Sequence, residues 1–219
     1  MNFHNPILLL LVSACTGVYS DPALATAPAG PTDPTDTVDP PQIVSGNKRA
    51  FVTSTTYQGG VIGGLAGADA KCAAHASAGG LAGSYKAWLS DSHKSAASRL
   101  THSTGTYSLI DGTLVAASWD DLVATRLQHA IDHDELGRAI PGSLDCYGSD
   151  ITAAWTQTTI KGDIFRQVTF GCTDWTEISN DRGSLGANVG LVMASDSFWT
   201  EGVCGITCTE RAALYCLEQ

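Results

Sequence analysis

Cysteine places the strongest constraint on how this chain can fold. The sequence holds seven cysteines, and six of them lie from residue 72 onward. An even number of cysteines in an exported chain predicts a framework of disulfides, and spacing alone leaves several pairings open. The alternative is a zinc site, in which the C-x3-C pair would act with two upstream cysteines. The six residues are Cys72, Cys146, Cys172, Cys204, Cys208 and Cys216.

The amino terminus predicts export. Residues 1–15 contain an apolar run from Ile7 to Val12 that is too short to cross a bilayer as a helix, and they end on Val-Ser-Ala-Cys15. This ending resembles a bacterial lipobox, so we expect a signal peptide at 1–15, lipidation of Cys15 and an exported lipoprotein at the outer membrane or cell surface. The leading region has no Lys or Arg, and a secretory signal cut near Ala25 is the alternative.

Composition divides the rest of the chain into a tether and one domain. Residues 16–46 are rich in Pro, Thr, Ala and Asp, which predicts a disordered, extended tether. Residues 47–219 are long enough to bury a substantial core. They carry 18 of the 22 acidic residues and all 12 basic ones, a net charge of −6. Such an acidic surface argues against nucleic acid as a partner, because phosphate binding needs a basic face.

Periodicity and turn residues predict an α+β domain. We expect a first strand from Phe51 to Thr55, a first helix over 67–78 and a strand beginning at Tyr85, where apolar and polar residues alternate. Ser118 is placed to cap a second helix over about 119–126. From Gly137 onward the pattern predicts short strands with long connections.

The first helix carries further expectations. A glycine-rich turn precedes it, and Asp69 would stand in its first turn, where a carboxylate meets the positive end of the helix. Gly79 and Gly80 should end it. One face of the helix should pack inward, with Cys72 tied to a distant partner. That face would hold Leu65, Cys72, Ala73 and Ala76.

Several fragments taken in order resemble a known family. They are KRAFVTS at 48–54, GLAGADAKC at 64–72, GLAGSYKAWLS at 80–90, SWDDL at 118–122, AW at 154–155, CTDWT at 172–176 and CTERAALYCLEQ at 208–219. Together they resemble the endostatin domain of collagens XV and XVIII and bacterial endostatin-like proteins with a C-type-lectin-like fold. The resemblance implies that fold, two short helices packed on short antiparallel strands with disulfide-stapled loops. It also implies the pairs Cys72–Cys216 and Cys172–Cys208, which leaves Cys146–Cys204 as a third.

Two kinds of binding residue are candidates. The five tryptophans should mostly anchor the core, with Trp199 placed to contribute to a binding rim. A calcium site could use oxygen ligands after Trp175, although the order differs from that of sugar-binding C-type lectins. Its candidate ligands are Glu177, Asn180 and Asp181.

The histidines offer one weak metal site. His129 and His133 lie four residues apart and could share a metal if their segment were helical, but nearby Gly137 and Pro141 favour an exposed acidic loop. The zinc site of endostatin uses an amino-terminal histidine cluster that has no counterpart in this sequence. The remaining histidines, His75, His93 and His102, are scattered.

These patterns favour a binding function over a catalytic one. The sequence contains no motif of a serine hydrolase, a zinc protease or a nucleotide-binding loop. We expect a non-enzymatic, surface-anchored module for adhesion or recognition of an extracellular protein or glycan, with loops of about 126–150 and 176–200 forming its contact face. The alternative is a secreted hydrolase with a loop-borne histidine such as His133.

Overall fold

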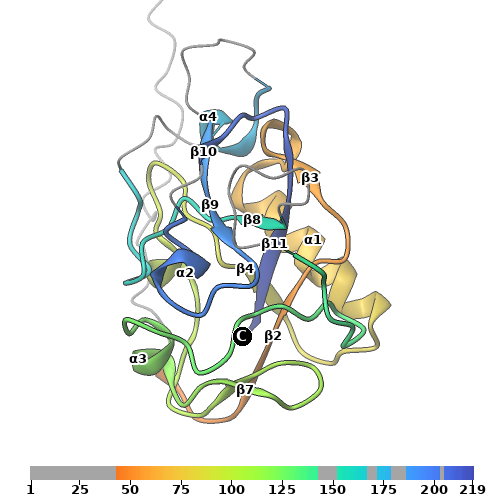
Figure 1. The fold of residues 1–219 in the computed structure, drawn as a ribbon, viewed down its shortest axis with the longest axis vertical. Helices are drawn as coiled ribbons and strands as arrows, with labels where there is room; N and C mark the ends of the chain where they lie inside the picture. Colours follow the sequence, from red (N-terminus) through yellow and green to blue (C-terminus); the bar gives the residue numbers. More distant parts are fainter. Residues whose placement is uncertain (1–42, 143–151, 167–171, 179–185, 203–204) are drawn as a thin grey trace, which may run out of the picture. The chain divides into compact units, whose positions relative to one another are not determined.

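The computed structural model describes residues 43–142, 152–166, 172–178, 186–202 and 205–219. The chain separates into two units, 1–37 and 38–219, and the described residues all belong to the second. The expected signal peptide at 1–15, Cys15 and almost all of the tether lie outside the described residues. This second unit is a mixed α+β domain with one large sheet and few helices, as expected (Figure 1).

The carboxy-terminal strand β11 (Arg211–Glu218) is the centre of the sheet. Six consecutive residues of this strand, from Ala212 to Leu217, are buried, so the strand is covered on both faces. It pairs in antiparallel fashion with β2 (Lys48–Val52) and in parallel with β8 (Ala153–Trp155). A continuous apolar run is what such a central position requires, because no face of the strand meets water.

Further strands extend the sheet on both sides of β11. Among the described residues the order is β10-β9-β8-β11-β2-β6-β7, and β3 and β4 pair with β11 off this path. A separate parallel pair joins β1 to β5. The bounds are β1 Ile43–Val44, β3 Tyr57–Gln58, β4 Tyr85–Ala87, β5 His102–Ser103, β6 Tyr107–Ser108, β7 Leu114–Ala116, β9 Ala187–Leu191 and β10 Gly205–Ile206.

The longest helix, α1 (Gly64–Ala78), packs against β4 and β11. Its buried face is Ala68, Cys72 and Ala76, at the four-residue spacing that keeps side chains on one side of a helix. Small side chains there allow a close approach to the sheet. The helix ends as expected at Gly79 and Gly80, and the φ of +68° at Gly80 suits glycine.

Two details of α1 differ from expectation. The helix begins at Gly64, three residues early, so Asp69 lies beyond the first turn. The carboxylate of Asp69 instead accepts hydrogen bonds from the backbone of Ala87 and from Arg99, each at 2.5–2.9 Å. Ala73 is exposed, and the inward face therefore runs through Ala68 in its place.

Two disulfides staple this architecture, and they are the two pairs that the resemblance implies. Cys72–Cys216 joins α1 to β11, with 5.5 Å between the Cα atoms. Cys172–Cys208 joins the short element α4 (Cys172–Trp175) to the turn before β11. The third pair, Cys146–Cys204, lies outside the described residues.

The remaining helical elements are single turns: η1 (Gly59–Val61), α2 (Ala96–Arg99), α3 (Trp119–Leu122) and η2 (Ser197–Trp199). Ser118 caps α3 as expected, because its side chain accepts a hydrogen bond from the N–H of Asp121. The helix ends at Leu122 rather than 126. Beyond it the chain turns away, and Leu127 and Gln128 donate backbone hydrogen bonds to Ser195 and Val115.

Element α4 is a left-handed turn. Its four residues, Cys172 to Trp175, all have φ between 50° and 70°, a conformation that side-chain-bearing residues rarely adopt. The disulfide holds one end, and Asp174 accepts two hydrogen bonds from Ser92. Trp175 is buried and donates from Nε1 to the carbonyl of Ser90. These tertiary contacts compensate the strain of the backbone.

Candidate functional site

The five tryptophans all belong to the core. Trp88, Trp155 and Trp175 are fully buried, and Trp119 is nearly so. The expectation that Trp199 contributes to an exposed rim is wrong, because its side chain is 1% exposed and packs beside Trp88 and Tyr215. Its position in η2 therefore turns the indole toward the core.

The segment around His129 and His133 is neither helical nor an exposed acidic loop. Its backbone runs beside the end of β2, and the N–H of Val52 donates to the carbonyl of His133. The carboxylates of the segment point into the structure: Asp132, Asp134 and Glu135 are all buried. Each buried carboxylate has hydrogen-bond or ion-pair partners, which offset the free-energy cost of removing a charge from water.

Asp134 organises a tight turn that follows. Its Oδ1 accepts hydrogen bonds from the backbone of Leu136 and Arg138, and its Oδ2 accepts one from Nε of Arg138 at 2.8 Å. Burial would raise the pKa of Asp134, but these hydrogen bonds outweigh it and hold that pKa below the ordinary value. The acidic residues here therefore build the fold.

The expected metal sites find no support in the described part of the chain. The rings of His129 and His133 lie 6.4 Å apart, and no group of three or more potential ligands in the described ranges could hold a metal ion. Of the candidate calcium ligands, Glu177 is exposed, and Asn180 and Asp181 lie outside the described residues.

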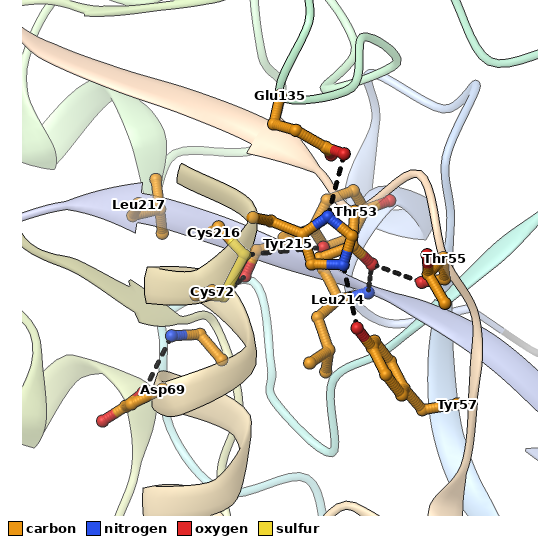
Figure 2. Close-up of a disulfide and its surroundings, with 12 residues drawn as sticks. Thr53, Thr55, Tyr57, Asp69, Cys72, Glu135, Leu214, Tyr215, Cys216 and Leu217 are labelled. Atoms are coloured by element: carbon orange, nitrogen blue, oxygen red, sulfur yellow. Dashed lines mark hydrogen bonds and ion pairs between the residues drawn. A yellow bond between two sulfur atoms is a disulfide. The ribbon is translucent and has the colours of Figure 1, made fainter. Parts of the chain in front are cut away.

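A hydrogen-bonded chain through His75 is a feature that the sequence did not reveal (Figure 2). The Oε1 atom of Glu135 lies 2.9 Å from Nδ1 of His75, and the hydroxyl of Tyr57 lies 2.8 Å from Nε2. Both carboxylate oxygens of Glu135 also accept hydrogen bonds from Ser54. The chain thus joins α1, β3 and the segment after α3 beside the Cys72–Cys216 disulfide.

This arrangement occupies both ring nitrogens of His75. Nδ1 donates to the carboxylate of Glu135, and Nε2 shares a hydrogen bond with the hydroxyl of Tyr57. Burial, followed by the nearby charge of Glu135, raises the pKa of Tyr57 and keeps the phenol protonated. Burial acts to raise the pKa of Glu135 too, but the hydrogen bonds from Ser54 and His75 lower it overall. With both ring nitrogens bonded inside the protein, His75 braces three segments and offers no free nitrogen to a substrate.

A surface hollow of about 300 Å³ lies beside α3. In Figure 1 the helix α3 lies at the end of the domain away from α4. The residues of the hollow come from β5 and the start of α3: His102, Ser103, Thr104, Ser118, Trp119 and Asp120. The imidazole of His102 stacks on the indole of Trp119, with 3.7 Å between ring centroids and an interplanar angle of 13°. Trp88 packs against the same indole, so the half-exposed ring of His102 is the aromatic surface that the hollow presents.

The polar groups of this hollow have capacity left for a ligand. Nε2 of His102 lies 2.8 Å from the carbonyl of Ala97, and since a carbonyl only accepts, Nε2 carries a proton, which leaves Nδ1 as the acceptor of the neutral imidazole. The side chain of Asp120 is exposed and has no partner within the described ranges. The Ser118 hydroxyl accepts from Asp121 and can still donate its own proton.

Two other hollows are less suited to a specific ligand. One of about 380 Å³ runs along the alanine-rich exposed side of α1 beside Tyr57, where Lys71 already lies over the tyrosine ring at 5.1 Å. Another of about 400 Å³ is formed by α2 and the segment 163–166, with His93, Lys94 and Arg166 on its walls beside Asp163. Neither combines an aromatic face with unpartnered acceptors as the hollow at His102 does.

Sequence reasoning missed His102 and Asp120. The capping pattern at Ser118 correctly predicted a helix that begins at Trp119, but nothing in the sequence connects that helix to the histidine on β5.

None of the helices in the described ranges is long and apolar enough to cross a membrane. No protein-family model and no curated protein matches this chain.

Proposed function

We propose that residues 47–219 form a non-enzymatic binding module that recognises an extracellular protein or glycan. The observation that carries this proposal is the hollow at His102, where a stacked aromatic pair stands beside unpartnered polar groups on a surface. Small-ligand sites commonly combine an apolar or aromatic wall with a few polar groups that fix orientation.

The scaffold around this hollow supports binding. Trp119 packs on the buried Trp88, and His102 is held by its stack on Trp119 and by its hydrogen bond to the carbonyl of Ala97. A pre-organised surface loses less conformational entropy when a ligand binds. The two nested disulfide pairs also support the finer fold that the resemblance implies, a C-type-lectin-like domain of the endostatin-like type.

The contacts of His133 do not favour the alternative, a secreted hydrolase. Its Nδ1 lies 2.7 Å from Asp132, and its Nε2 faces Asp111 at 3.7 Å. In a hydrolase, the histidine that activates a hydroxyl nucleophile uses its two ring nitrogens differently. One nitrogen binds the carboxylate that orients the ring, and the other binds the hydroxyl. In this protein a second carboxylate, that of Asp111, faces the nitrogen where the hydroxyl would lie.

Display at a cell surface completes the proposal. Lipidation of Cys15 would anchor the protein, and the acidic, proline-rich segment 16–46 would hold the module away from the membrane. The protein then contacts the membrane only through its lipid, and the folded domain binds the ligand.

An array experiment tests the proposed function. The purified, oxidised full-length protein is applied to arrays of glycans and extracellular matrix proteins, with an unrelated acidic lipoprotein as the reference. We expect saturable binding to members of at least one class. Binding no greater than that of the reference would overturn the proposal. Turnover on an esterase, peptidase or glycosidase panel that His133→Ala abolishes would then favour the hydrolase.

A further inference from the structure

We propose that the hollow at His102 is a saccharide site that accepts a neutral or amino sugar ring and rejects sulfated or phosphorylated sugars. This inference rests on the proposed function and specifies its ligand. It needs no calcium, because every contact that it invokes comes from a side chain on β5, on α3 or at the residues next to them.

The aromatic pair provides the apolar contact. A pyranose ring has one face of C–H groups, which packs favourably on the electron-rich face of an aromatic ring. In this hollow the partly exposed imidazole of His102 is backed by the indole of Trp119, with 3.7 Å between the ring centroids, and this stack favours one orientation of the imidazole. The hydrogen bond from Nε2 to Ala97 fixes the same ring from its edge.

The polar groups match the hydroxyls of a sugar. Nδ1 of His102 and the carboxylate of Asp120 are acceptors, and the hydroxyls of Ser118 and Thr104 both donate and accept. Hydroxyl groups of a ligand can donate to the two acceptors, and a charged acceptor makes the stronger bond. A volume of about 300 Å³ is at the lower end for small-ligand sites and suits one or two rings.

Charge decides which sugars are accepted. Asp120 is the acidic residue among the described residues that line the hollow, and the domain as a whole carries a net charge of −6. An anionic sulfate or phosphate group would lie next to a carboxylate, with no Lys or Arg among the described lining residues to offset it. An amino sugar would gain an attraction at the same place.

The test uses the full-length protein and defined probes. Methyl glucoside, methyl galactoside, N-acetylglucosamine and glucosamine are titrated by saturation-transfer NMR and by intrinsic tryptophan fluorescence, with glucose 6-sulfate as the anionic counterpart. We expect binding of at least one neutral or amino sugar and at least tenfold weaker binding of the sulfate. Asp120→Ala and His102→Ala should each weaken binding at least tenfold.

Asp163→Ala is the matched control, because Asp163 is also an exposed carboxylate but lines a different hollow. It should bind sugars as the unchanged protein does, and the melting temperature of each variant confirms that it is folded. If sugars bind but Asp120→Ala and His102→Ala bind them equally well, the assignment to this hollow is overturned while the binding module stands.

Two further outcomes separate this inference from the proposed function. Capture of a matrix protein on the array without any neutral or amino sugar binding would overturn the saccharide inference alone. No binding of any sugar or array component would overturn both.

Discussion

The carboxylate of Glu135 lies 2.9 Å from Nδ1 of His75 and ties the segment after α3 to the helix α1. Both side chains are largely buried, at 5% and 12% exposure. The same carboxylate accepts hydrogen bonds from Ser54, two residues after β2. One acidic residue thus fixes the relative positions of three separate segments of the domain.

Replacing this carboxylate should destabilise the domain. We expect Glu135→Gln to lower the free energy of unfolding at pH 7 by about 1–3 kcal/mol, because hydrogen bonds to a charged acceptor are lost inside the protein. Urea denaturation measures the change. Glu177→Gln, at an exposed glutamate, is the control and should be neutral. Equal stability of the two variants would contradict a bracing role for Glu135.

The same residue predicts a pH dependence. The folded-state pKa of Glu135 is lower than its ordinary value of 4.5, so the stabilisation is complete above that value and is lost as the pH falls through the folded-state pKa. The free energy of unfolding of the unchanged protein should therefore exceed that of Glu135→Gln most at pH 6, and this difference should shrink as the pH is lowered below about 4. A difference that stays constant across this range would show that the charge of Glu135 contributes nothing.

The two disulfides should differ in their contribution to stability. Cys72–Cys216 spans 144 residues and Cys172–Cys208 spans 36, a fourfold difference in loop length. Each doubling of loop length adds about 0.6 kcal/mol of closure entropy to the unfolded chain. Removing either bond by paired Cys→Ala substitution should cost about 2–5 kcal/mol, with the longer loop costing about 1 kcal/mol more. Thermal unfolding under oxidising conditions compares the two, and a larger cost for the short loop would contradict this order.

The sequence predicted best where local rules decide the structure. Glycine at 79 and 80 ends α1, and Ser118 caps α3, because both effects depend on neighbouring residues alone. The tryptophans were correctly placed in the core on size and apolarity, with Trp199 as the exception. Two of the disulfide pairs came from a resemblance and not from spacing.

Tertiary contacts explain what the sequence could not predict. Acidic residues beside glycine and proline usually mark a surface loop, yet Glu135 is buried because Ser54 and His75 reach it from distant segments. The helix at Trp119 is short because the chain after it bonds to Val115 and Ser195. The hollow likewise depends on a stack between His102 and Trp119 that no periodicity connects.

The left-handed turn α4 gives a prediction about backbone strain. Thr173 has φ 50° and an exposed side chain, and a left-handed conformation costs a residue with a Cβ about 1–2 kcal/mol. Glycine removes this cost but gains entropy in the unfolded chain, so Thr173→Gly should raise the stability by up to about 1 kcal/mol. Ser77→Gly, at an exposed position in the right-handed helix α1, should lower it by about 0.5–1 kcal/mol. Destabilisation by both substitutions would contradict the left-handed turn.

The close approach of η1 to the segment after α4 gives a sharper test of the same region. A Cβ on Gly60 would lie 2.2 Å from the carbonyl oxygen of Glu177 and 2.4 Å from the backbone nitrogen of Ile178. Backbone atoms cannot move aside as a flexible side chain does, so Gly60→Ala should force the two segments apart and cost about 1–3 kcal/mol. Gly205→Ala is the control, because a Cβ there would meet no atom within 4 Å. Thermal unfolding of both variants decides the point: if Gly60→Ala is as stable as Gly205→Ala, η1 does not lie against the turn that Cys172 and Cys208 hold in place.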